Sequence, residues 1–488
     1  MAKNIIICSD GTGQQGGGAS PTNVYRLYTM IDTHASQIAL YDDGIGTESK
    51  NKLWQAFSRM FGFGFKKNII FLYRFLAKHY EPGDKIFLFG FSRGAATVRA
   101  LAGMIQKVGL LRNDYPGILT KEGVIDSLEM RVECYKAMYY YRKASSKPEL
   151  AEEFKIKKTH GSVDIEIVGC WDTVSALGFP KDSSWLIIGL SKLIDIVSDK
   201  LMPHRYYEYQ LDKNVRCAYH ALSIDDERKS FHPMLWNEGL ENRPQFIEQV
   251  WFPGSHSNIG GGYDRTELSS ITLDWMIRNA KKHGLILYDY LHEEVFFEKN
   301  PAGKLYDSRK GLFRYYRYDP RHIRDLSNAN SVDRIMIHSS AFERINLFDY
   351  YPVLPNNFDI VGDFEGHYEE RSDEVKHWKK RVNKMTFARK INYHILVETT
   401  VLMGMLAWYL FKYGEQTDPG KEITYNIFVS SFPAFLEPFI NYCIYQQPLV
   451  GLAFVAVIGF SVGANSVLKL LSDRLYKRIN WSLLRPVN

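Results

Sequence analysis

The chain has 488 residues, 45% of them hydrophobic and 14% aromatic, which is enough for one large domain or two to three smaller ones with a sizeable core. Its net charge of +6 comes from 61 basic and 55 acidic side chains, a balance that does not indicate a nucleic-acid-binding protein. Five scattered cysteines without a CxxC pair argue against a zinc site or a disulfide framework and fit a reducing compartment.

The first predicted element is a buried strand over 5–8, followed by glycines at GxGxxG spacing from Gly11 onward. In a dinucleotide-binding fold, a helix begins at these glycines and its N-terminus receives the pyrophosphate. Here more glycines and Pro21 follow, and a helical pattern resumes only near Val24. Because glycine runs and proline do not begin a helix in this way, the sequence argues against a nicotinamide or flavin cofactor and predicts none.

Apolar runs alternate with helical patterns through the first two thirds of the chain. Strands are predicted over 5–8, 38–41, 86–89, 165–168, 217–224 and 247–252, with helices between them, for instance over 68–80 and 94–108. Such alternation predicts an α/β fold, a parallel sheet with helices on both faces. Two more polar stretches, near 112–160 and 285–375, are predicted to be cap insertions above the sheet, which places a catalytic domain at 1–375.

The composition changes near residue 376, where seven basic residues follow without an intervening acid. Two apolar runs, about 391–411 and 449–468, then approach the roughly 20 residues that a membrane span needs. Both outer flanks are basic and the loop between the runs is not, so region 376–488 is predicted to be a transmembrane hairpin with both ends cytoplasmic. The alternative is a pair of buried helices in a soluble cap domain.

The segment KIFLFGFSRGAATVRALAGMI, residues 85–105, carries the strongest functional pattern. A short apolar strand runs into a GxSxG turn and then into a helix of small and apolar residues, the context of a nucleophile elbow. Gly90 and Gly94 are expected to leave room for the strained turn that presents Ser92 above the strand.

A serine nucleophile needs a base and an acid that orients the base, in the chain order serine, acid, histidine for this kind of hydrolase. Asp172 and His256 each follow a predicted strand end, so both can reach the edge where Ser92 lies. The rival acids are Asp225 and Asp226. The rival histidines are His220, predicted to be a core residue, together with His232 and His338.

An acyl-transfer site also needs N–H donors that face the oxyanion of the intermediate. The backbone N–H of Arg93 is one candidate, because it follows the nucleophile directly. The second candidate is Gly11 or Thr12, in the loop after the first strand, which ends at the same sheet edge. The glycine-rich loop is thus interpreted as part of an oxyanion hole.

The sequence resembles the α/β-hydrolase catalytic domain of the type VI secretion phospholipase effectors, the group with GFSRGA at the elbow. The resemblance covers about 1–345 and rests on the blocks SDGTGQ, YDDGIGT (41–47), GFSRGAATVRALAG (90–103), CWDTVSALG (170–178), YHALSIDDERKSFHPMLW (219–236) and VWFPGSHSNIGGGY (250–263). It implies the same triad, Ser92, Asp172 and His256. Two positions depart from the family pattern: Asn258 replaces an acid, and Ser175 replaces a glycine. The first departure argues against a metal or proton role for that position.

The sequence as a whole predicts a membrane-anchored serine phospholipase without a cofactor or a metal. Membrane phospholipid would be both substrate and anchor, no nucleic acid is expected, and an immunity or regulatory protein and homo-oligomerisation stay open as partners. A chain anchored in the bacterial inner membrane with a cytoplasmic catalytic domain would fit a toxic antibacterial or anti-phage effector. The alternatives are an esterase or thioesterase acting on small soluble substrates, and a membrane-permeabilising hairpin regulated by the hydrolase domain.

Overall fold

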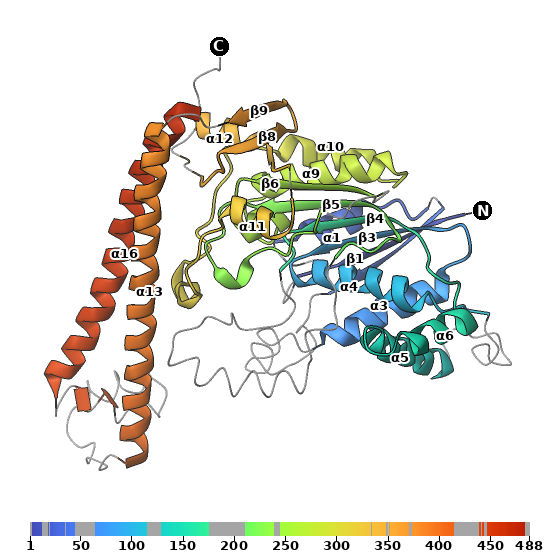
Figure 1. Cartoon of the computed structure of the whole chain (residues 1–488), viewed down its shortest axis with the longest axis horizontal. Helices are drawn as coiled ribbons and strands as arrows, with labels where there is room; N and C mark the ends of the chain where they lie inside the picture. The colour runs from blue at the N-terminus through green and yellow to red at the C-terminus, as the bar shows by residue number, and fades with distance from the viewer. Residues whose placement is uncertain are drawn as a thin grey trace. The chain divides into compact units, whose positions relative to one another are not determined.

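The computed structural model (Figure 1) describes residues 2–11, 18, 20–34, 36–43, 64–114, 128–174, 210–238, 245–332, 334–347, 350, 352–369, 373–413, 439–440, 442–443 and 447–483. The chain divides into two compact units. One contains a large sheet and its helices, and the other contains two long C-terminal helices together with residues 311–319. The division after Arg371 lies close to the expected one at 375, while the assignment of a separate role to each part stays a prediction.

Within the described residues, the sheet of the first unit has nine strands in the order β2-β1-β3-β4-β5-β6-β7-β8-β9. Neighbouring strands are parallel except for the antiparallel pair β8 and β9. The strands are β1 (Asn4–Ser9), β2 (Gln37–Asp42), β3 (Lys85–Phe91), β4 (Ile165–Trp171), β5 (Val215–Ser223), β6 (Phe246–Phe252), β7 (Met336–His338), β8 (Asn357–Val361) and β9 (Gly366–Glu369). The strand order reverses between β1 and β3, the position at which α/β sheets bind ligands beyond the carboxyl ends of their strands.

The alternation of side chains along the inner strands places apolar residues in two separate cores. On β1, Ile5 and Ile7 join the core under one helical layer, whereas Ile6 and Cys8 join the core under the other. This period of two is what a strand covered on both faces requires. The six predicted strands and the α/β class are therefore confirmed by β1 to β6.

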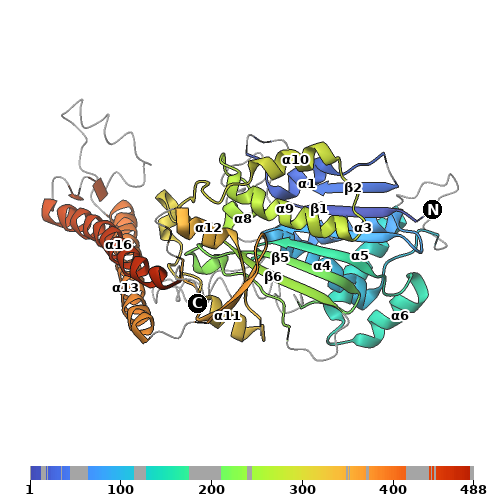
Figure 2. The same ribbon diagram turned by 90° about the horizontal axis from the view of Figure 1, so that it is seen from above.

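Helices cover both faces of the sheet (Figures 1 and 2). One core includes residues of α3 (Phe65–His79), α4 (Arg93–Val108), α5 (Leu128–Lys143) and α6 (Pro148–Lys158). The other core includes residues of α1 (Asn23–Met30), α9 (Glu267–Lys282) and α10 (Asp289–Glu298). The helical predictions over 68–80 and 94–108 match α3 and α4.

The expected cap insertions need correction. In the stretch 112–160, α5 and α6 pack against α3 and α4 and bury Met130, Cys134 and Phe154 in the same core, so they belong to the helical layer. In the stretch 285–375, β7, β8 and β9 continue the sheet from β6, and α12 (Ser340–Leu347) lies between β7 and β8 in the chain. These strands have only 3, 5 and 4 residues, so they lack the longer apolar run that reveals an inner strand, which is why the sequence suggested a cap.

The second unit consists mainly of α13 (Asp373–Tyr413) and α16 (Pro448–Leu483), which pack side by side (Figures 1 and 2). Segments Lys379–Leu410 and Pro448–Leu475 are long and apolar enough to cross a membrane by length and composition. They contain most of the two expected spans. Between the helices, Asn392 donates to the carbonyl of Ser461 at 2.7 Å, and the Ser461 hydroxyl donates to the carbonyl of Asn392 at 3.1 Å.

Candidate active site

Ser92 lies on the sharp turn between β3 and α4. Its backbone is at φ 57° and ψ −120°, in the left-handed half of conformational space that residues other than glycine rarely adopt. The neighbouring glycines explain how the turn closes. A Cβ atom at Gly90 would lie 2.6 Å from the nitrogen of Ala95, and one at Gly94 would lie 2.1 Å from the carbonyl oxygen of Ser9. The structure thus supports the steric reason for the expected GxSxG geometry.

His256 begins the short helix α8 (His256–Gly260) just after β6. Its Nε2 lies 2.8 Å from Ser92 Oγ, a hydrogen-bond distance. The ring packs between Phe91 and Phe231, with ring centroids 4.7 Å and 4.9 Å away. The aromatic contacts and the position at the helix start hold the imidazole toward the serine.

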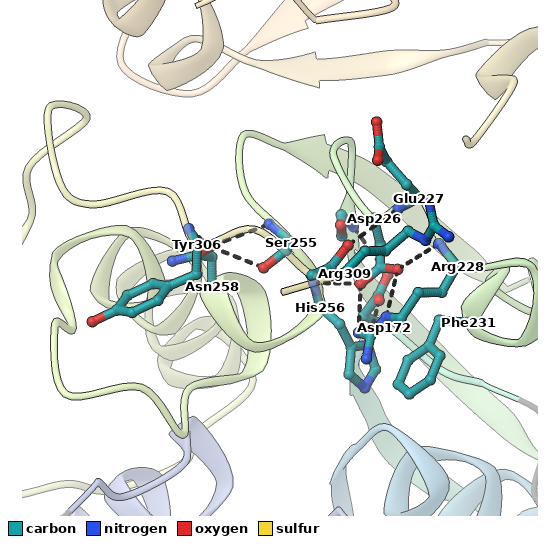
Figure 3. A network of polar contacts seen from close by, with 12 residues as sticks. Asp172, Asp226, Glu227, Arg228, Phe231, Ser255, His256, Asn258, Tyr306 and Arg309 are labelled. Carbon is teal, nitrogen blue, oxygen red and sulfur yellow. Dashed lines mark hydrogen bonds and ion pairs between the residues drawn. The ribbon is translucent and has the colours of Figure 1, made fainter. Parts of the chain in front are cut away.

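Asp172 lies directly after β4, with a φ of 42°. Its Oδ2 lies 2.5 Å from Nδ1 of His256 (Figure 3), whereas Ser92 is bonded to the other ring nitrogen, Nε2. The other carboxylate oxygen accepts the backbone N–H of Ser223 at 3.0 Å. A continuous hydrogen-bonded chain therefore runs from the carboxylate through the imidazole to the serine hydroxyl.

The rival residues occupy other positions. Asp226 accepts the backbone N–H of His256 at 3.2 Å and pairs with Arg228, while Asp225 accepts the N–H of Gly254 at 2.6 Å. Neither acid has a hydrogen bond to the His256 ring in the described part of the chain. Among the rival histidines, His220 is fully buried in β5, His338 bonds to Ser340 at 2.9 Å, and His232 donates its backbone N–H to Lys229.

The buried position of His256 favours its neutral form. Burial lowers the pKa of His256 below its usual value, although the hydrogen bond to Asp172 works in the opposite direction. Burial opposes ionisation of Asp172 as well, but the Arg321 guanidinium and the bond to His256 outweigh it and hold the pKa of this carboxyl well below its usual range. At neutral pH the site therefore combines a neutral imidazole with an ionised carboxylate, the state in which histidine can accept a proton.

Comparison with known proteins gives a family assignment. The model of the T6SS phospholipase effector Tle1-like catalytic domain matches residues 3–279, more than half of the chain. The chain belongs to this family. It is also similar to the uncharacterized protein YEL023C of Saccharomyces cerevisiae, at 32% identity over 258 residues, which cover 48% of this chain and 33% of that protein. The matched region thus spans only about a third of the length of this curated relative.

Two solved structures show weaker likeness to this Tle1-like chain. An uncharacterized protein from Pseudomonas aeruginosa has 15% identity and a TM-score of 0.35, with 94% of this chain and 62% of that chain covered. The Tle1 effector bound to the VgrG spike from the type 6 secretion system has 17% identity and a TM-score of 0.29, with 54% and 51% covered.

One position at which this Tle1-like domain departs from the family pattern has a structural explanation. Asn258 accepts the backbone N–H groups of Ser255 at 3.3 Å and Tyr306 at 3.2 Å, and its amide donates to the carbonyl of Lys304 at 3.0 Å (Figure 3). A carboxylate could accept these bonds but could not make the donation. Asn258 thus links the start of α8 to a neighbouring loop. Ser175, the other departure, lies outside the described residues.

The oxyanion donors expected in this domain need one revision. The backbone N–H of Gly11 donates to Asp10 Oδ1 at 2.6 Å, so in this conformation it does not face Ser92. Its Cα nevertheless lies close to the nucleophile, because a Cβ there would be 3.3 Å from the Cβ of Ser92. Thr12 lies outside the described residues, and Arg93 is the first residue of α4, as expected. Arg93 and Thr12 stay predictions for this role.

Two arginines beside the candidate triad of this Tle1-like domain were not predicted from the sequence. Arg321 contacts the Asp172 carboxylate. Arg228 lies next to Phe231 (Figure 3), with its guanidinium 3.4 Å from the centre of the ring. Arg321 is 149 residues from Asp172 in the chain, and no spacing or motif marks it. Within the described ranges, no cluster of three or more His, Cys, Asp or Glu side chains is arranged to hold a metal ion.

Proposed function

We propose that this chain is a membrane-anchored serine phospholipase with an α/β-hydrolase fold, which cleaves acyl esters through an acyl-Ser92 intermediate. The main support is the chain of hydrogen bonds from Asp172 through His256 to Ser92, at 2.5 Å and 2.8 Å. The parallel sheet with the nucleophile after β3 and the histidine after β6 agrees with an α/β-hydrolase order of serine, acid and histidine. Membership of a phospholipase effector family supports the choice of a lipid ester.

In the proposed mechanism, Ser92 Oγ attacks the ester carbonyl carbon while His256 Nε2 accepts the hydroxyl proton. Asp172 holds Nδ1 and stabilises the imidazolium that forms. The tetrahedral intermediate then collapses, the bond to the alcohol breaks, and His256 returns the proton to the leaving oxygen. A water molecule, activated by the same histidine, hydrolyses the acyl-serine and restores the enzyme.

The negative oxygen of the intermediate needs donors that are in place before the reaction. The backbone N–H of Arg93 is the first proposed donor, because α4 begins there and the positive end of the helix dipole favours negative charge. Thr12 is proposed as the second. The loop that carries it begins beside Ser92, as the position of Gly11 indicates.

The anchoring proposal rests on how α13 and α16 are built. Only 17% of the most apolar window of the first helix and 6% of that of the second are buried inside the protein. Core helices of a soluble cap domain would be mostly buried, so the low burial favours spans over that alternative. The basic residues before 391 and after 468 place both ends on the positive side, normally cytoplasmic. A relative occurs in yeast, so relatives of this chain are not confined to bacteria. We therefore propose only that both helix ends lie on the cytoplasmic side of a membrane, and the bacterial inner membrane stays an expectation.

Vesicle hydrolysis by the full chain tests the proposal. The protein is purified in mild detergent and reconstituted into vesicles of phosphatidylethanolamine and phosphatidylglycerol, and the lipids are analysed by mass spectrometry. Free fatty acid and lysophospholipid are expected, together with hydrolysis of a short-chain nitrophenyl ester in detergent. Hydrolysis of the short ester alone would favour the soluble-substrate alternative. Diacylglycerol or phosphatidic acid as the product would contradict acyl-ester cleavage.

A further inference from the structure

The catalytic acid proposed above is held by a second charged side chain. Arg321 is fully buried, and its two terminal nitrogens contact both oxygens of Asp172, at 2.6 Å for Oδ1 and 2.8 Å for Oδ2. The same guanidinium donates to the carbonyl of Ser223 at 2.7 Å and to that of Phe231. Only the planar fork of an arginine can make this two-pronged contact with a carboxylate.

These contacts determine which way the carboxylate faces. One oxygen of Asp172 is shared by Arg321 and the backbone N–H of Ser223, and the other is shared by Arg321 and His256 Nδ1. The carboxylate cannot rotate without losing several bonds at once. Arg321 also spans the end of β5 and the 3₁₀ turn η2 (Lys229–Phe231), so it ties together the elements that surround the acid.

The same contacts balance charge beside the base. The charged groups at His256 include Asp172 at its Nδ1 and Asp226 at its backbone N–H, and each of these acids is paired with an arginine, Arg321 and Arg228 respectively. Each of these two negative charges next to the histidine is therefore offset by a positive one. An unpaired Asp172 would instead attract a proton to the ring.

We propose that Arg321 is a positioning residue of the catalytic acid: its fork fixes the Asp172 carboxylate against His256 Nδ1, and its charge keeps the imidazole neutral until Ser92 releases its proton. This inference rests on the proposed triad. It assigns to Arg321 two separable contributions, a geometric one that needs the fork and an electrostatic one that needs only a positive charge.

The test measures kcat and KM for a short-chain ester against pH, with the full chain in detergent. Arg321→Met removes both contributions, so kcat is expected to fall about 10²-fold or more, and the acid limb of kcat/KM to move upward by about one pH unit or more. Arg321→Lys keeps the charge without the fork, so kcat is expected to fall while the acid limb stays near its original pH. The KM for a small ester is expected to change little in both variants.

Arg344→Met is the matched control for the loss of a buried arginine. Arg344 lies in α12 and donates to the carbonyls of Pro301 and Gly303. A comparable loss of stability without a shift of the acid limb is expected. If Arg321→Met leaves the acid limb in place and costs no more kcat than Arg344→Met, the positioning role is wrong. If Arg321→Met does not fold, the Arg321→Lys variant provides the test. An unchanged kcat in that variant would show that the two-pronged contact of the guanidinium with Asp172 is not required, and the positioning role would be wrong.

A double-variant cycle separates this role from general support of the fold. If Arg321 acts through Asp172, Asp172→Asn combined with Arg321→Lys should lose little more kcat than Asp172→Asn alone. If the losses of kcat in the two single variants add up in the double variant, Arg321 does not act through Asp172. The proposed function fails independently, since a Ser92→Ala variant that keeps hydrolysing esters would reject the triad itself, whatever Arg321 does.

Discussion

The sheet unit and the two-helix unit distribute their residues in opposite ways. In the sheet unit, Ile5, Ile6 and Ile7 are completely buried. In α16, the large apolar residues face outward, with Leu449 76% and Phe460 73% exposed, whereas Ser461 is only 1% exposed. Large apolar side chains of α16 are thus exposed, while the buried positions of this unit hold polar side chains such as Ser461 and Asn392 as well as apolar ones such as Leu396.

This difference is what the proposed membrane location of the two-helix unit would require. Burial of apolar surface stabilises the sheet unit in water, and the residues of the candidate active site are among the polar groups buried inside it. Outward apolar residues would give no such stabilisation in water, but they match the hydrocarbon of a bilayer, where packing and hydrogen bonds between helices hold the pair together. We therefore expect substitutions in the sheet unit to change ester hydrolysis most, and substitutions in the two-helix unit to change membrane association most.

The largest effect is expected from Ser92→Ala, which removes the nucleophile of the sheet unit. Ester hydrolysis should fall by several orders of magnitude, about 10⁴-fold or more, because Ser92 is the proposed site of the acyl intermediate. Ser162→Ala, at an exposed serine before β4, is the control and should keep full activity. Near wild-type turnover of Ser92→Ala would overturn the assignment.

The same variant tests the regulated-hairpin alternative. Dye-loaded vesicles report membrane damage independently of ester chemistry. If lipid hydrolysis causes the damage, Ser92→Ala should stop dye release. Full dye release by this variant would show that the two-helix unit permeabilises membranes by itself. The membrane damage would then be an activity of the two-helix unit and not of the sheet unit.

Asp172→Asn is expected to have the next largest effect. Loss of the negative charge and of the correct histidine tautomer should lower kcat by about 10³- to 10⁴-fold. Asp225→Asn is the control at a half-buried acid close to the site, because Asp225 accepts hydrogen bonds from Gly254 and Tyr350 and not from the imidazole. The choice of acid would be wrong if Asp225→Asn were the more damaging of the two.

In the two-helix unit, charges placed on the outward apolar face should weaken membrane association. The full chain is expected to stay with membranes during alkaline carbonate extraction. Val455→Arg combined with Phe460→Arg should make it extractable, because each arginine near the centre of a span costs about 2.5 to 3.5 kcal/mol. Phe297→Arg, at an 81% exposed residue of the sheet unit, is the control and should change nothing. If carbonate readily extracts the unaltered chain, the membrane-span proposal is wrong, and α13 and α16 are better explained as helices of a soluble cap domain.

The smallest effect is expected between the two helices. Ser461→Ala removes one hydrogen bond to the carbonyl of Asn392 and should destabilise the helix pair by about 0.6 kcal/mol, the average for such bonds in membranes. Unfolding of the reconstituted protein in a denaturing detergent measures the change. A loss of several kcal/mol would mean that this contact is buried in an environment quite unlike lipid.

Much of the sheet and of the triad could be predicted because their signals are local. An inner parallel strand buried on both faces appears as a short apolar run, and β1 to β6 all do. The residues Ser92, Asp172 and His256 follow such runs directly, so the shared sheet edge brings them together. The short strand β8 and the edge strand β9, with Asn357, Asp359 and His367 among their residues, have no such run and were missed.

The parts of the site that were missed depend on contacts between distant segments. Nothing near Arg321 in the sequence indicates that it meets a carboxylate 149 positions earlier. The orientation of the Gly11 amide could not be predicted from the sequence either, because it depends on a hydrogen bond to the side chain of the neighbouring Asp10. The position of Gly11 after a predicted strand showed that it lies at the same edge of the sheet as Ser92. It did not show which acceptor its N–H would bond to.

The path of the chain limits how far the two units can be treated as separate modules. Residues 311–319 belong to the two-helix unit, where Asp319 lies 2.5 Å from Lys390 of α13 and Tyr318 packs under Arg389 at 4.1 Å. Arg321 is only two residues further along the backbone. A chain shortened to end near Asp373 would therefore lose the partners of Tyr318 and Asp319, which lie immediately beside Arg321, the residue that holds the proposed catalytic acid. Lost activity in such a truncation would not measure anchoring alone, and domain dissection of this protein is better done by point substitution than by cutting.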